Sequence, residues 1–180
     1  MPWGASALRV AADDPYVLAN AAWALGLFGE DIAAAIALID RCLQLNPSFA
    51  RGWVRSGWLR LWAGKYDLGI EHFEMSIRLS PRESRSGTYL GIGVGHFFVR
   101  RGEKAAEMIS SSLQEKSTWA PTLRFMASCL AHMGHLKEAQ EIVKRLRAIT
   151  PVVMPTAENW RIREDREYYL DGLRLAAGLK

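Results

Sequence analysis

The chain has 180 residues, of which 49% are hydrophobic and 23% are charged, so it can bury a core and is not a disordered polypeptide. Its longest nearly apolar stretch, Tyr89–Val99, is shorter than the roughly 18 residues that a membrane-spanning helix needs, so we expect no membrane protein. Lys and Arg exceed Asp and Glu by 23 to 19, and a net charge of +4 is too small to indicate nucleic-acid binding by itself.

Two features predict a cytoplasmic location. Asp13 and Asp14 directly precede the first apolar stretch, where a secretory signal would carry positive charge. Cys42 and Cys129 each lie in a helical pattern without a second ligand at metal-binding spacing. We therefore expect two free, buried thiols in a reducing compartment.

In chain order, the predicted elements form a repeat. Residues 1–14 are expected to be the remnant of a preceding repeat helix. Four helix–turn–helix units follow, at 15–47, 48–81, 82–117 and 118–151, and 152–180 is expected to be a C-terminal capping segment. Three of the units end in a proline, at Pro47, Pro81 and Pro151, with intervals of 34 and 70 residues. This period predicts a solenoid of stacked helix pairs.

The second unit shows the pattern most clearly. Its helices are predicted at about 49–63 and 67–79, and Gly64 between them can adopt the left-handed conformation that ends a helix. Pro81 prevents the second helix from continuing. In the other units, the glycines expected to end the first helix in the same way are Gly29, Gly102 and Gly134. Helices this short are not stable alone in water, so the pairs must stack on one another.

The units at 50–81 and 120–151 resemble the tetratricopeptide repeat (TPR) family in register. The matching positions of the first are Trp53, Ser56-Gly57, Gly64, Tyr66, Gly69, Phe73, Ser76 and Pro81. Those of the second are Leu123, Met126-Ala127, Gly134, Ala139, Val143, Leu146 and Pro151. The resemblance implies an all-α fold, an α-solenoid of antiparallel helix pairs with a C-terminal capping helix.

The resemblance also implies a concave groove, built by the first helix of each pair, that binds a protein or peptide. The positions expected to face this groove are Trp23, Arg51, Trp58, Trp62, Tyr89, His96, Arg100 and Arg124. Aromatic side chains offer a large contact area and arginine pairs with carboxylates, so a partner with apolar and acidic residues is expected. The alternative role of Trp58 and Trp62 is to pack against the next repeat or the cap.

No pattern for catalysis, a cofactor or a metal site is present in the sequence. The glycine-rich stretch 91–95 lacks the Gly-Lys-Ser/Thr ending of a phosphate-binding loop, and Ser110–Ser112 lacks the glycines of a nucleophile elbow. His132 and His135 are separated by the helix-breaking Gly134. Acidic residues are spread among the basic ones, which favours a solvated charged face over a nucleic-acid surface. We therefore expect a non-catalytic interaction scaffold.

A narrower resemblance suggests an alternative function. The motif 45–47, the run 96–102 and the ending 169–176 are similar to the C-terminal TPR region of bacterial class III adenylate/guanylate cyclase-like proteins and of related winged-helix regulators. This implies a regulatory region of a signalling protein, with the catalytic domain elsewhere. Such a region would act through intramolecular contact or self-association, for instance as a homodimer through its terminal helices.

Overall fold

The computed structural model describes residues 13–28, 31–82 and 85–179, and every regular element within them is a helix. The helices are α2 (Pro15–Phe28), α3 (Ile32–Leu45), α4 (Ala50–Trp62), α5 (Tyr66–Leu79), α6 (Ser86–Phe98), α7 (Gly102–Glu115), α8 (Ala120–His132), α9 (Leu136–Arg147) and α10 (Arg163–Ala177). The expected remnant helix at 1–14 lies almost entirely outside the described residues, as does Gly29. The predicted all-α solenoid is confirmed.

The helices begin and end where local chemistry requires it. Asp31 caps α3, because its Oδ1 accepts a hydrogen bond from the backbone N–H of Ala34 at 2.8 Å. Gly64 and Gly134 follow α4 and α8 with φ of 78° and 82°, the left-handed conformation that ends a helix most cheaply at glycine.

The turn of the third pair differs from the prediction. The left-handed residue there is Arg100, with φ of 62°, whereas Gly102 is already the first residue of α7. Alignment by glycine alone therefore places this turn two residues too late. A non-glycine residue in this conformation costs about 1 kcal/mol, so interactions elsewhere must hold Arg100 in place.

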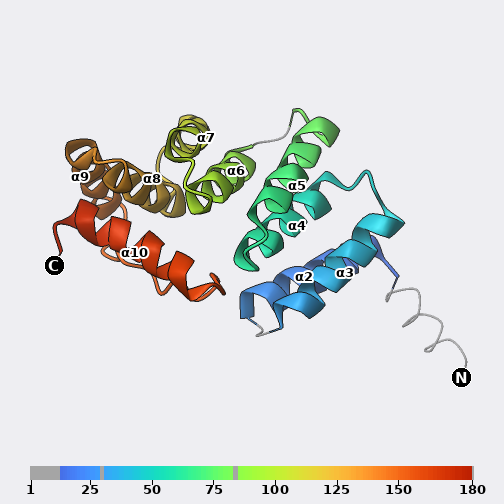
Figure 1. The fold of residues 1–180 in the computed structure, drawn as a ribbon. Coiled ribbons are helices and arrows are strands. Elements are labelled where there is room, and N and C mark those ends of the chain that lie inside the picture. The colour runs from blue at the N-terminus through green and yellow to red at the C-terminus, as the bar shows by residue number, and fades with distance from the viewer. Residues whose placement is uncertain (1–12, 29–30, 83–84, 180) are drawn as a thin grey trace, which may run out of the picture.

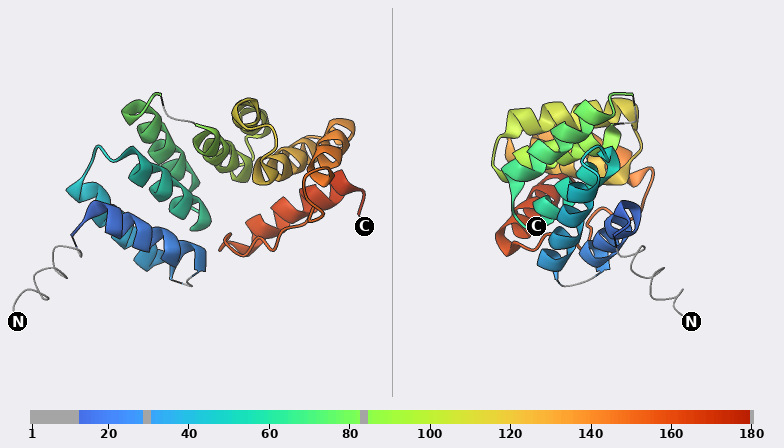
Figure 2. Two further views of the ribbon diagram at one scale, coloured as in Figure 1. Left: turned by 180° about the vertical axis from the view of Figure 1, so that it is seen from behind. Right: turned by 90° about the vertical axis from the view of Figure 1, so that its right-hand side faces the viewer.

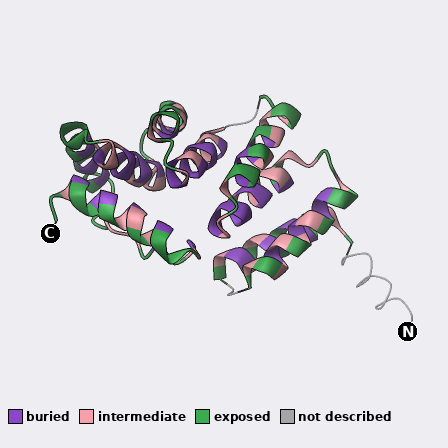
Figure 3. Ribbon diagram, in the orientation of Figure 1, coloured by how far each residue is buried: buried purple, intermediate pink, exposed green. Residues whose placement is uncertain are grey.

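The helix pairs form an open arc, with α2, α4, α6 and α8 on its inner side (Figures 1 and 2). Each of these first helices packs mainly against the second helix of its own pair, and α4, α6 and α8 also pack against the second helix of the preceding pair. Burial is most extensive in α6 and α8, the first helices of the last two pairs (Figure 3).

The last helix, α10, covers the final pair but does not continue the regular stacking. It packs mainly against α8, the first helix of that pair, and less against α9. Residues 152–162 lead from α9 toward the ends of α2 and α4, and α10 returns from there along the arc (Figure 1). We call residues 152–177 the C-terminal segment.

The backbone strain at Arg100 can be measured with two substitutions. Arg100→Ala and Arg100→Gly remove the same side-chain contacts, but only glycine relieves the positive φ. We expect the glycine variant to be more stable than the alanine variant by about 1 kcal/mol in urea unfolding.

Val99 provides the matched control, since its φ is −86°. There the glycine variant should be less stable than the alanine variant, because glycine loses more conformational entropy on folding. Equal stability of the two Arg100 variants would contradict a strained turn.

Candidate functional site

The inner face of the arc is formed by α2, α4, α6 and α8, the helices to which most of the predicted groove residues belong, and it has two parts. The part near α6 and α8 is covered by the C-terminal segment, and we call it the closed half. The part near α2 and α4 is the open half. The segment reaches the boundary between them, where the backbone N–H of Arg161 donates to the carbonyl of Trp62 at 3.1 Å. The Arg161 Nη2 atom also donates to the carbonyl of Gly26 at 3.0 Å.

In the closed half, aromatic side chains of the segment are buried on aromatic side chains of α6 and α8. Trp160 lies with its ring centroid 4.7 Å from that of Phe98 and 5.6 Å from that of Phe125. Tyr169 stacks on Phe125 at 4.2 Å. Trp160 and Tyr169 are both buried. Aromatic contacts of this kind add stabilisation beyond the area they bury.

Tyr168 joins the segment to two further side chains of the closed half. Its ring stacks on His132 at a centroid distance of 3.7 Å. The guanidinium carbon of Arg100 lies 3.3 Å from the centroid of the same ring. A cation over an aromatic face is attracted to it, so this contact helps to hold Arg100 in its left-handed conformation.

Three side chains of α8 bind backbone carbonyls of the segment. Arg124 donates from Nε to Val153 at 3.1 Å and from Nη2 to Val152 at 2.6 Å. Ser128 Oγ donates to the carbonyl of Tyr169 at 2.9 Å, and His132 Nε2 lies 2.7 Å from the carbonyl of Tyr168. Hydrogen bonds to carbonyls hold a polypeptide without regard to its side chains, as is typical of peptide recognition.

A buried carboxylate fixes the start of α10. The hydroxyl of Tyr66 donates to Asp165 Oδ2, and Arg100 Nη2 lies 4.0 Å from Asp165 Oδ1. Burial and the hydrogen bond to Asp165 raise the pKa of Tyr66, so this hydroxyl keeps its proton and acts as a donor. Asp165 is only 8% exposed, and its charge therefore needs both partners.

In the open half, three tryptophans form a continuous row. The rings of Trp23 and Trp62 are 5.1 Å apart and those of Trp58 and Trp62 are 6.4 Å apart. Trp62 is buried, whereas Trp23 and Trp58 are half-buried. Trp58 also packs on Phe73, with an edge-to-face contact at 5.5 Å. The rings of Trp58 and Trp62 thus contact side chains of their own pair and of the preceding pair, and part of the row remains accessible.

Two arginines lie on α4, the helix that also carries Trp58 and Trp62. Arg51 is exposed and Arg55 is half-buried. Burial and the positive charge of Arg51 lower the pKa of Arg55 below its usual value. Arg55 was not among the predicted groove residues, although its position one turn after Arg51 on the same helix could have indicated it.

Tyr89 and His96 are not brought to the segment by any contact that the structure shows. The Tyr89 hydroxyl accepts from Arg85 Nη1 at 3.2 Å. Burial, followed by the charges of Arg101 and Lys104, lowers the pKa of His96, and its Nδ1 has no hydrogen-bond partner among the described residues. The predicted groove residues therefore form three groups. Arg100 and Arg124 contact the segment, and the three tryptophans and Arg51 lie on the helices of the open half. Tyr89 and His96 belong to neither group.

One polar network brings together residue types used in catalysis. Arg60 Nη2 donates to Asp40 Oδ1 at 2.7 Å, and Arg60 also donates to Ser56 Oγ. His72 Nδ1 lies 3.0 Å from the same Ser56 oxygen. Ser56 has no exposed surface, so no substrate can reach it. The network instead pairs the buried charge of Arg60, which is 6% exposed.

The described part of the chain shows no candidate site for metal binding or for a reactive thiol. No group of three or more His, Cys, Asp and Glu side chains there could hold a metal ion. Cys42 and Cys129 are free and buried, and burial raises the pKa of Cys129 to about 11. Neither thiol forms the reactive thiolate readily. Among the residues that the structure describes, no helix has both the length and the apolar character that a membrane-spanning helix requires.

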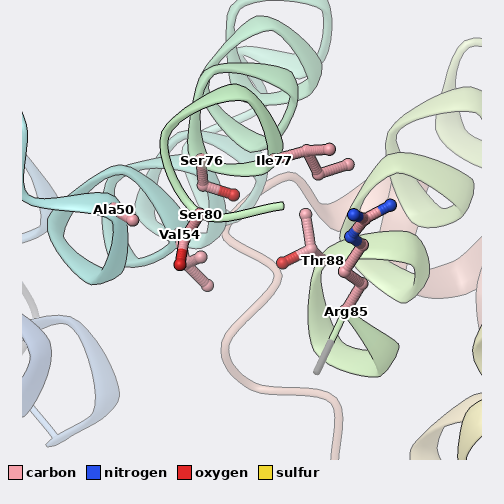
Figure 4. Close-up of a pocket in the computed structure, with 7 residues that line it drawn as sticks. All are labelled: Ala50, Val54, Ser76, Ile77, Ser80, Arg85 and Thr88. Carbon is pink, nitrogen blue, oxygen red and sulfur yellow. The ribbon is translucent and has the colours of Figure 1, made fainter. Parts of the chain in front are cut away.

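Two of the cavities among the described residues differ widely in size. The pocket in Figure 4, between α4, α5 and α6, has a volume of about 30 Å³. It has room for about one water molecule and is too small for an organic ligand. A shallow groove of about 480 Å³ lies between α7, α8 and α9, with Leu113, Met126, Leu130 and Ile142 on its apolar floor.

Comparison with known proteins supports the fold and goes no further. No protein-family model matches the sequence, and no curated protein matches it. The structure described as YrrB, a TPR protein with an unusual peptide-binding site, is 19% identical, with a TM-score of 0.63 over 97% of this chain and 90% of that one. The type IV pilus biogenesis factor PilW is 14% identical, with a TM-score of 0.74 over 96% and 78% of the two chains. MamA of Desulfovibrio magneticus RS-1 is 20% identical, with a TM-score of 0.66 over 76% of each chain.

These neighbours establish a TPR-like helical solenoid. At such low identity the similarity extends to the fold alone. The resemblance to the TPR region of cyclase-like proteins gains no support from them.

The network around His72 makes stability depend on pH. Burial and the charge of Arg60 lower the pKa of His72 from 6.5 to about 4. The unfolded chain binds the proton near 6.5 and the folded chain only near 4, so the free energy of unfolding falls as pH decreases through this interval. We expect His72→Gln to make the decrease between pH 7 and pH 5 shallower in urea unfolding.

His135→Gln is the matched control, since His135 is exposed. Its pH profile should follow that of the unsubstituted chain. An equal slope for the His72→Gln variant and the unsubstituted chain would show that His72 is not held neutral by the fold.

Proposed function

We propose that this chain is a non-catalytic protein-interaction module that binds a polypeptide on the inner face of its helical arc. The observation that supports this most directly is the binding of backbone carbonyls by Arg124, Ser128 and His132. These side chains already hold a polypeptide segment on this face. A TPR protein of similar fold, YrrB, is described as having a peptide-binding site, which agrees with the proposal.

The open half is the surface that a partner can reach without any rearrangement. Trp23 and Trp58 are half-buried there, and Arg51 is exposed. Tryptophan and arginine are the residue types that most often dominate binding energy at interfaces. Arginines 51 and 55 also raise the local positive charge, so the partner that fits is a polypeptide with apolar and acidic residues.

The alternative function is regulation of a cyclase-like signalling protein through self-association of terminal helices. No contact in the described residues favours it, and the structural neighbours do not support it. An interaction module accounts for the inner face without that assumption. The cytoplasmic location stays a prediction.

The proposal is tested by selecting binders from a library of random peptides on the intact chain. We expect the selected peptides to be enriched in aromatic and acidic residues. Their affinity, measured by fluorescence anisotropy, should fall about tenfold or more with Trp58→Ala and with Trp23→Ala, because both substitutions remove accessible aromatic surface.

Leu68→Ala is the control, since Leu68 is 40% exposed on α5, the second helix of its pair. This variant should bind the peptides as the unsubstituted chain does. Unchanged affinity in both tryptophan variants, with helical circular dichroism intact, would reject the open half as the binding surface.

A further inference from the structure

The C-terminal segment occupies the inner face as a bound peptide would. A helix that merely capped the solenoid would take the place of the next first helix and pack mainly on α9, but α10 packs mainly on α8. The residues before it reach Gly26 and Trp62, at the boundary with the open half. The segment therefore covers the closed half of the inner face.

We propose that the C-terminal segment is an intramolecular ligand of the closed half, and that a polypeptide partner with the same spacing of anchor residues displaces it. This inference rests on the proposed function and specifies the partner of the same face. The occupant to which we commit is a helical polypeptide segment preceded by a large aromatic residue.

The contacts define the chemistry of that partner. Trp160 fills the aromatic site of Phe98 and Phe125, and five residues later Asp165 binds Tyr66 and Arg100. Tyr168 and Tyr169 follow at three and four residues from Asp165, which places the three side chains on one face of a helix.

A small residue completes the pattern. A Cβ atom on Gly172 would overlap Ser128 Oγ and would lie 2.7 Å from the ring of His132. Only glycine at this position lets α10 approach α8 so closely. The displacing segment thus carries Trp-x4-Asp-x2-Tyr-Tyr-x2-Gly or its chemical equivalent.

The attachment of the segment to the rest of the chain is compatible with its displacement by a partner. It is joined to α9 through exposed residues, with Ile149 42% and Val152 53% exposed, and its release breaks none of the helix pairs. The opposite side of α10 carries charged, exposed residues such as Arg163 and Glu167. Because the segment is tethered, its effective concentration is in the millimolar range, and a partner must bind tightly to compete with it.

The experiment begins with the intact chain, into which a protease site is inserted after the exposed Pro151. After cleavage, a fluorescently labelled peptide of residues 152–179 is added, and its uptake is followed by anisotropy. We expect the labelled peptide to exchange into the cleaved protein and unlabelled peptide to compete with it.

Two altered peptides make the readout specific. The peptide with Gly172→Val should compete at least about tenfold less well, because the added side chain meets Ser128 and His132. The peptide with Leu175→Val should compete as the natural sequence does, since Leu175 is 52% exposed on the same helix. Equal competition by the two peptides would overturn the assigned site.

Other outcomes also decide the question. A folded, cleaved protein that takes up no peptide would show that the segment is not displaceable. Aggregation of residues 1–151 after release would show that the segment is an essential part of the core. A dimer of the uncleaved chain in sedimentation equilibrium, dissociated by added peptide, would identify the segment of a second copy as the occupant and overturn the intramolecular assignment.

A second variant avoids cleavage. In the full chain, Gly172→Val should expel the segment and allow the labelled natural peptide to bind at least about tenfold more tightly than to the unsubstituted chain. Leu175→Val in the full chain should not. Absence of binding to a Gly172→Val chain with native helical circular dichroism would overturn the proposal.

This inference and the proposed function can fail separately. Loss of selected-peptide binding in Trp58→Ala, with no exchange of the segment, would leave a module that binds through its open half alone. Exchange of the segment without any effect of the tryptophan substitutions would place all binding in the closed half.

Discussion

The arc depends on how closely its middle helices approach around Phe73. This ring is fully buried, and a Cβ atom on Gly57 would lie 2.8 Å from it. A Cβ atom on Gly91 would overlap it. Two glycines on neighbouring first helices therefore leave room for one aromatic ring, which sets the spacing of α4 and α6. The packing of α4 and α6 around Phe73 also fixes the positions of Trp58 and Phe98.

The sequence was sufficient for the features that depend on local pattern. Helical periodicity, Gly64 and Gly134 predicted the pairs and two of their turns. The turn at Arg100 was missed because its conformation is held by distant partners, Tyr168 and Asp165, and not by a glycine. Local propensity cannot report a backbone conformation that tertiary contacts impose.

The same reason explains why the groove was predicted but its occupant was not. The groove geometry that the TPR resemblance implies nominated Arg100 and Arg124 for the inner face. The contacts that place the C-terminal segment there join residues far apart in sequence, such as Tyr66 with Asp165 and Arg161 with Gly26. No spacing within 152–180 distinguishes a helix that caps the last pair from one that lies along the inner face. The packing of Gly172 on α8 and these long-range contacts do so.

Trp62 connects the two halves of the inner face. Its ring contacts Trp23 and Trp58 in the open half, while its backbone carbonyl accepts from Arg161 in the C-terminal segment. The two halves of the inner face therefore meet at the point where the segment turns back into α10. If a partner of the open half also carries the anchors of the segment, the two contacts reinforce each other through effective concentration. A partner without those anchors binds beside an intact segment and gains only the surface of the tryptophans and arginines.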